Sequence, residues 1–309
     1  MAQRSLAGRF SWTLRDYAKR VWDNSGEDNV LFLAGGIAFN IILAAVPFIL
    51  LLAAGITLLL PLLYVGKINS QDAVFALIDR LMPPQSETTA ASLHALIVTL
   101  LKARTSVGLY SAIGFIWFST RLFGSLRTVL ASVFDIESER GIIQGKVFDV
   151  KITVVSTLLF VASTAFSTYI ALGTSRSVQA LTSLGMRKDV ISGLEYWVGR
   201  SLAFIFLALM FFALYKFLPV RRVRTATAWV AALFTSILFE AARVVFSYYA
   251  RAFNPGSLYT GTLTILVVMI IWFYYAALIF ILGGEVGQVY ELRRTRKLQR
   301  ERFVDPVSA

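Results

Sequence analysis

The chain has 309 residues, of which 57% are hydrophobic and only 16% charged, and its mean hydropathy is +0.69. Soluble domains carry about 25% charged residues, so this composition excludes an ordinary soluble protein and favours a chain embedded in a bilayer. Cysteine is absent and histidine occurs once, which excludes disulfides, thiolate metal sites and centres built from paired histidines.

Six apolar stretches are long enough to cross a bilayer as helices, since a span needs about 20 apolar residues. They cover residues 30–62, 106–124, 152–173, 197–218, 226–250 and 262–284. The first is longer than a straight span needs, which predicts tilt or a bend near Pro47. The last is expected to continue as a helix into the basic tail. We therefore expect an all-α, polytopic membrane protein with six transmembrane helices in one membrane domain, residues 30–290.

The distribution of lysine and arginine predicts the orientation of these spans. With the N-terminus inside, 20 of the 30 basic residues fall in cytoplasmic segments and 8 in outer segments. Basic residues concentrate on the cytoplasmic side of membrane proteins, so both termini are expected in the cytoplasm, which requires an even number of spans. This placement explains the net charge of +12 by topology and contact with anionic membrane lipids, and it argues against nucleic-acid binding.

Three segments lie outside the central parts of the predicted spans. Residues 1–29 contain no apolar region of a signal peptide, but their apolar side chains share one helical face, which is typical of an interfacial helix on the cytoplasmic leaflet. Residues 63–105 carry apolar residues at helical spacing and are expected to form a short helical cap on the outer face, with His94 as a packing residue. Residues 291–309 are expected to form a basic cytoplasmic tail.

The fifth stretch carries the clearest polar face within a span. Ser236, Glu240, Arg243 and Ser247 project within about 60° of one another on a helix, and Glu240 and Arg243 stand at positions i and i+3. A charge at membrane depth costs about 2.5–3.5 kcal/mol, so these groups should face protein or water. Two interpretations stay open: an ion pair that fixes helix register, or the polar wall of a cavity whose pair opens when substrate or a proton binds.

Two further spans contribute candidate lining residues. The third has a stripe of hydroxyl groups that includes Thr157, Thr164 and Thr168, which indicates either close helix packing or a wettable surface. In the first span Asn40 and Pro47 lie on one narrow face. The asparagine needs a polar partner away from lipid, and a break near the proline would free backbone carbonyls at mid-depth, although a kink without function is the commoner outcome.

Arg121 and Glu285 end the second and sixth spans, both on the inner side in this topology. Arg121 has a plain structural explanation, since a long cationic side chain reaches the headgroups from a helix end. A carboxylate gains nothing from anionic headgroups, so Glu285 is expected to meet Arg121 or another inner cation. Together they would form a gate at the cytoplasmic mouth of a cavity.

Few residues are available for catalysis or for a cofactor. The 18 acidic residues are mostly isolated in loops, and no pattern of metal ligands is present. The phosphate-binding pattern GxxxxGK[ST] and the nucleophile pattern GxSxG are both absent from the sequence. We therefore expect no enzyme activity, no metal and no cofactor. A transport cycle would use an ion or proton gradient, a partner ATPase or downhill flow.

Four segments together resemble the YihY/BrkB family of bacterial inner-membrane proteins. They are AGGIAFNIILAAVP at 34–47, GFIWFSTRLFGSLR at 114–127, FALYKFLP at 212–219 and YTGTLTILVVMIIWFYYAALIFILGGE at 259–285. The resemblance implies six spans, a bacterial cytoplasmic membrane and a role in export, resistance or envelope lipid biogenesis. The family's first-span motif usually reads AxxLAYYxLLSLFP, and here Phe39 and Asn40 replace the two tyrosines. A ribonuclease label attached to the family finds no acid–base pair or metal ligands in this chain.

The leading hypothesis is a transporter that exports an organic solute or an amphipathic, lipid-like molecule through a cavity in the helix bundle. Asn40 would offer neutral hydrogen bonds, Arg243 would contact an anionic group, and Glu240 would be a counter-charge that responds to protons. The alternatives are a non-transporting membrane scaffold for envelope biogenesis and, less favoured, a membrane-bound hydrolase. The sequence leaves the substrate open, and it is compatible with an oligomer.

Overall fold

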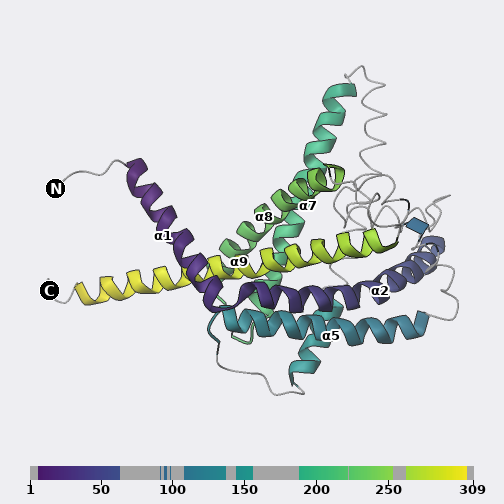
Figure 1. The fold of residues 1–309 in the computed structure, drawn as a ribbon, viewed down its shortest axis with the longest axis horizontal. Helices are drawn as coiled ribbons and strands as arrows, with labels where there is room; N and C mark the ends of the chain where they lie inside the picture. The colour runs from purple at the N-terminus through teal and green to yellow at the C-terminus, as the bar shows by residue number, and fades with distance from the viewer. Residues whose placement is uncertain are drawn as a thin grey trace.

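The computed structural model of the protein describes residues 6–62, 108–136, 144–155, 188–221, 223–252 and 262–304, together with the single residues 91, 94, 95 and 98. Regular structure in this part of the chain is α-helical throughout, as predicted. The helices are α1 (Leu6–Glu27), α2 (Val30–Leu62), α5 (Gly108–Val133), α7 (Lys188–Phe217), α8 (Thr225–Ala252) and α9 (Thr262–Val304), shown in Figure 1. Residues 144–155 form a further helical segment.

A sharp turn separates α1 from α2. Residues Arg15–Glu27 and Val30–Ala45 meet at an angle of 67° across a break of two residues. Asn29 makes the turn with a φ of 51°, in the left-handed region that asparagine tolerates better than most residues. The amide groups of Asp28 and Asn29 donate to carbonyl oxygens of the last turn of α1, so the turn leaves these donors satisfied. The turn lets α1 leave the bundle while α2 enters it.

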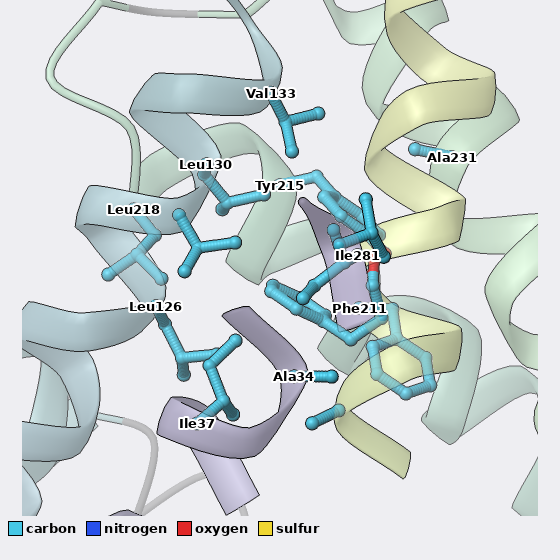
Figure 2. Packing of buried hydrophobic residues seen from close by; sticks show 14 of the residues in the cluster. Ala34, Ile37, Leu126, Leu130, Val133, Phe211, Tyr215, Leu218, Ala231 and Ile281 are labelled. Atoms are coloured by element: carbon cyan, nitrogen blue, oxygen red, sulfur yellow. The ribbon is translucent and has the colours of Figure 1, made fainter. Parts of the chain in front are cut away.

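The helices pack around α2 and α9. Helix α2 lies alongside α5 on one side and α9 on the other, α9 contacts α8, and α8 contacts α7 (Figure 1). The side chains of this core converge between α2, α5, α7 and α9 (Figure 2). Its fully buried members include Ile37, Leu130, Tyr215, Leu218 and Ile281. Because lipid tails are as apolar as these side chains, close packing rather than escape from water is what holds such helices together.

Glycines in α9 allow that close packing. A Cβ added at Gly283 would lie 1.8 Å from Thr235 Oγ1 on α8, and one at Gly287 would lie 3.0 Å from the Cβ of Ala231 on the same helix. The two glycines are four residues apart and therefore lie on one face of α9. They form the small-xxx-small motif that lets the backbones of two membrane helices approach each other.

Tyr215 of α7 closes the same contact from the other side. Its side chain is fully buried, its hydroxyl donates to the Phe280 carbonyl oxygen at 2.6 Å, and it lies 2.7 Å from Thr235 Oγ1. Its ring stacks on Phe280 with the ring centroids 5.0 Å apart. A buried hydroxyl without partners would cost about 1–3 kcal/mol, so these bonds join α7, α8 and α9 at one point.

Two helices in the described part of the chain are long and apolar enough to cross a membrane, Thr225–Tyr248 in α8 and Leu266–Gln299 in α9. The bent pair Arg15–Glu27 and Val30–Ala45 is a third candidate, and Ala203–Phe217 is a shorter apolar helix. These observations agree with an all-α membrane protein. The count of six spans, the orientation of the termini and the division into segments stay predictions.

Five predicted spans correspond to described helices, and α7 and α5 extend well beyond their predicted spans, since α7 begins at Lys188 rather than at 197. The third predicted span, 152–173, lies mostly outside the described residues. The second predicted span, 106–124, corresponds to the longer helix α5, which continues to Val133. Helix α2 runs through Pro47 without a break, and it curves along its second half (Figure 1). Curvature accommodates the hydrogen bond that a proline removes. The expected continuation of the last span into the tail is confirmed, since α9 extends to Val304.

Candidate functional site

A group of three charged residues joins α7 to α8, and we call it the α7–α8 charged group. Glu240 of α8 accepts a hydrogen bond from Arg200 of α7 at 2.9 Å and lies 3.5 Å from the guanidinium of Arg243, one turn further along its own helix. The side chains are 25% exposed for Glu240, 40% for Arg243 and 41% for Arg200. One carboxylate therefore serves two cations, and the group is open to its surroundings rather than sealed in packing.

The two serines predicted on the same face of α8 bond to their own helix. Ser236 is fully buried and donates to the Ala232 carbonyl oxygen at 2.8 Å. Ser247 is half-buried and donates to the Val244 carbonyl oxygen at 2.9 Å. Each hydroxyl is satisfied by its own backbone, which is how serine is accommodated inside a helix. In this structure Ser236 packs in the bundle, and only Ser247 extends the open face of the charged group.

The polar residue predicted in α2, Asn40, also bonds to the backbone of its own helix. Asn40 is half-buried, and its side-chain amide donates to the Gly36 carbonyl oxygen at 2.9 Å, so its own helix supplies the polar partner it needs. Pro47 is buried against α5, 3.8 Å from the position that a Cβ on Gly114 would occupy. The proline thus fills a helix contact. No interruption of α2 exposes backbone carbonyls there.

The hydroxyl stripe of the predicted third span lies mostly outside the described residues. Thr157, Thr164 and Thr168 all fall in that part, and so does most of the predicted outer cap, 63–105. One member of the stripe is described: Thr153 is buried and donates to the Asp149 carbonyl oxygen at 2.7 Å.

Arg121 and Glu285 do not form the predicted ion pair. Arg121 is exposed, whereas Glu285 is fully buried and neither of its carboxylate oxygens has a hydrogen-bond partner. The reason is the length of α5. A Cβ on Gly284 would lie 3.0 Å from Val133 Cγ1, which is twelve residues, or about 18 Å along a helix, beyond Arg121. The carboxyl therefore lies near the end of α5, far from the arginine.

Glu285 lies instead in a buried polar environment built from three elements. Asp28 follows α1, Asp135 follows α5, and both act electrostatically on Glu285. The Gln288 side-chain amide donates to Asp135 at 2.5 Å, while its oxygen has no hydrogen-bond partner. A buried carboxyl beside two others costs free energy unless it is paired. Among the residues described here, no group of three or more ligating side chains is placed to hold a metal ion.

The sequence reasoning missed the role of Arg200. The signal was present, because Arg200 lies 17 residues before the end of α7 at Phe217 and Glu240 lies 15 residues after the start of α8 at Thr225. Two consecutive helices joined by a short turn run antiparallel, so residues equally distant from the turn lie at the same depth. The Gly283-x-x-x-Gly287 spacing in α9 is a second signal of this kind.

The predicted N-terminal helix exists and is attached to α9. The Tyr17 hydroxyl donates to the Val286 carbonyl oxygen, and the Arg293 guanidinium lies 4.9 Å from the centroid of the Tyr17 ring. Asp16 forms ion pairs with Arg20, at 3.2 Å, and with Arg293. The hydrogen bond from Arg20 holds the pKa of Asp16 below its ordinary value, and burial raises the pKa of Tyr17 to about 12.

Comparison with known proteins places the chain in a family. Residues 21–305 match the family described as virulence factor BrkB. A UPF0761 membrane protein of Aeromonas salmonicida (strain A449) is 26% identical over 281 residues, which cover 87% of each chain. The UPF0761 membrane protein YihY of Salmonella newport (strain SL254) is 26% identical over 294 residues, covering 95% of this chain and 94% of that protein. No solved structure matches. The family match covers most of the chain, including the α7–α8 charged group and Glu285. The chain therefore belongs to the virulence factor BrkB family.

Proposed function

We propose that the protein is a transporter of the bacterial inner membrane that exports an organic solute or an amphipathic, lipid-like molecule, and that it has no enzyme activity. The family match and the apolar helices support a membrane protein. Six spans with both termini in the cytoplasm are part of this proposal. In its support, α1 and the C-terminal end of α9 lie at the same end of the molecule (Figure 1), as an even number of spans requires.

The α7–α8 charged group carries the proposal. Glu240 lies 15 residues after Thr225, or about 22 Å along α8, so in the proposed topology it lies within a hydrocarbon core about 30 Å thick. Charged side chains at that depth are stable only against protein or water. The three side chains are a quarter to two-fifths exposed. Because charged groups are unstable against lipid, we infer that their exposed surface borders a water-filled space.

A tight contact between helices separates this group from the buried carboxyl of Glu285. Thr235 of α8 lies opposite Gly283 of α9 and Ala231 lies opposite Gly287, so the two helices run antiparallel and Glu240 lies about level with Leu278. Glu285 lies seven residues further, or about 10 Å along the helix. Gly283 and Tyr215 lie in the space between them, where the backbones are in close contact. Such a bundle, with a polar group on each side of a seal, suits a cycle in which the two sides open in turn.

Each charged residue then has a role in the proposed cycle. Arg200 and Arg243 hold an anionic part of the substrate, and Glu240 competes with that anion for the two guanidinium groups. Protonation of Glu240 releases the arginines to the substrate, which couples transport to a proton gradient. Asn40 offers neutral hydrogen bonds from α2. Glu285 takes part in the inner gate through the acidic residues around it, in place of the pair with Arg121 that the sequence suggested.

Transport in proteoliposomes tests this proposal. The two substrate classes need two probes, a trapped fluorescent organic anion and a tail-labelled fluorescent phospholipid, each followed with and without a proton gradient. We expect one probe to cross faster than in protein-free vesicles, and we expect Glu240→Gln and Arg243→Ala each to slow it by about tenfold. The matched controls, Glu27→Gln at the end of α1 and Arg221→Ala after α7, remove the same groups from exposed positions.

Two results would contradict the proposal in different ways. Full transport by both variants at normal folded yield would remove the charged group from the mechanism. No transport of either probe by the folded protein would favour the alternative, a membrane scaffold that acts in envelope biogenesis through its partners.

A further inference from the structure

We propose that a cavity between α1 and α9 binds the phosphate group of an anionic phospholipid of the cytoplasmic leaflet. The cavity has a volume of about 70 Å³ and opens to the surface. It is lined by Arg20 and Asn24 of α1 and by Val289, Leu292, Arg293 and Arg296 of α9. This inference concerns lipid binding and does not depend on the proposed transport.

The charge of the cavity fits an anion. Three guanidinium groups line it, and one carboxylate, Asp16, forms ion pairs with two of them, Arg20 and Arg293. Arg296 forms no ion pair or hydrogen bond with any residue that the structure describes. An excess of two positive charges therefore remains in a space bounded by fork-shaped donors. Arginine binds phosphate oxygens with two parallel hydrogen bonds, which suits it to this group better than lysine.

The existing contacts hold two of the arginines in place before a ligand arrives. Asp16 fixes the guanidinium groups of Arg20 and Arg293 from one side, and the Tyr17 ring lies under Arg293 at 4.9 Å. Tyr17 is itself anchored to α9 through its bond to the Val286 carbonyl oxygen. Long side chains lose rotational freedom when they bind a ligand. Here the two arginines are already held in place in the folded protein, which lowers the entropic cost of binding.

The size and the walls of the cavity indicate a lipid phosphate rather than a larger solute. A volume of about 70 Å³ holds a few water molecules or one small anionic group, and it is far below the space that a drug-sized ligand fills. Val289 and Leu292 form an apolar wall, and Leu292 is 41% exposed. On α1, Trp22 is 80% exposed two residues beyond Arg20. Trp22 projects about 200° away from Arg20, on the other face of α1. An exposed tryptophan on a helix that also carries arginine is typical of a helix at the membrane interface, where phosphate groups belong to lipids.

Lipid titration of the purified full-length protein in non-ionic detergent tests the site. Phosphatidylglycerol and phosphatidylcholine with identical acyl chains are added separately, and sodium phosphate is added at matched ionic strength. The apparent Kd is measured from the rise in Tm and, independently, from bound lipid in native mass spectrometry. Arg296→Ala is the test variant because the folded protein does not use this side chain in any described bond. Arg294→Ala is the control, since it removes the same charge from the same turn of α9 but from the opposite face, outside the cavity.

We expect phosphatidylglycerol to bind more tightly than phosphatidylcholine, Arg296→Ala to weaken its binding about fivefold, and Arg294→Ala to change it less than twofold. Equal weakening by the two variants would overturn the proposal, because it would show general attraction to a basic helix. Sodium phosphate that raises the Tm as much as the anionic lipid does would also overturn it, because the ligand would then be free phosphate.

Discussion

The substitution Gly283→Ala adds one methyl group at the contact of α9 with α8 and α7. Its Cβ would lie 1.8 Å from Thr235 Oγ1 and 2.6 Å from the Tyr215 hydroxyl, and both neighbours are fully buried. Thr235 or α8 must move, which breaks the hydrogen bond between the two hydroxyls. Overpacking costs about 1–3 kcal/mol and the lost bond about 1 kcal/mol, while alanine gains about 1 kcal/mol of helix propensity over glycine. We expect a net loss of about 1–3 kcal/mol.

The apparent Tm of the full-length protein in detergent measures this loss, with tryptophan fluorescence as the signal. Gly36→Ala is the control, because a Cβ at Gly36 meets no atom within 4 Å and alanine suits a helix interior. At about 2–4 °C for each kcal/mol, Gly283→Ala should lower the Tm by about 2–12 °C, and Gly36→Ala should leave it unchanged or raise it slightly. Equal changes in the two variants would refute the close contact between α8 and α9.

Three further substitutions test other parts of the structure. Tyr215→Phe removes the hydroxyl that bonds to the Phe280 carbonyl oxygen and to Thr235, and it should cost about 1–2 kcal/mol, measured as a fall in Tm; no change would refute those bonds. Glu285→Gln replaces a buried unpaired carboxyl by an amide that can donate to neighbouring carboxylates, so the Tm at pH 7 should rise; a fall would contradict the acidic environment. The pKa of Asp16 is lowered in the folded protein, so its contribution to stability is complete above the unfolded value of 3.8 and is lost as the pH falls through the lower folded value. Trp22 fluorescence should therefore report loosening of α1 only in acid, and Asp16→Asn should abolish that transition.

The local features of this fold are predictable from the sequence because they depend on short stretches of chain. The apolar run 30–62 corresponds to α2, Val30–Leu62, since its length and composition alone select a long helix. The continuation of α9 to Val304 follows from a run of helix formers without glycine or proline after Gly287. The turn at Asn29 falls where the predicted interfacial helix meets the first predicted span.

The contacts between helices could not be predicted, because periodicity gives the face and depth of a residue but not its neighbour. The sequence predicts Glu285 beside Arg121 because both residues stand at the inner ends of their predicted spans. Helix α5 continues to Val133, nine residues past the predicted end at 124, so Arg121 lies inside the helix and the acid meets its far end. A hydropathy pattern indicates which residues contact hydrocarbon. The end of a helix is set instead by capping residues and by the last backbone hydrogen bonds, so a helix can continue past its apolar part.

Single-cysteine labelling of α8 tests most directly whether its charged face borders water. The chain has no cysteine, so each variant carries one thiol. Ser247 lies on the same face of α8 as Glu240, two turns further along. Its neighbours Val245 and Tyr248 are 67% and 69% exposed and point away from that face. Only a thiolate in water reacts with a charged methanethiosulfonate reagent, so Ser247→Cys should be labelled about tenfold faster than Val245→Cys or Tyr248→Cys in intact membranes. Equal labelling of all three, or faster labelling at either flanking position, would contradict a water-filled space beside the charged group.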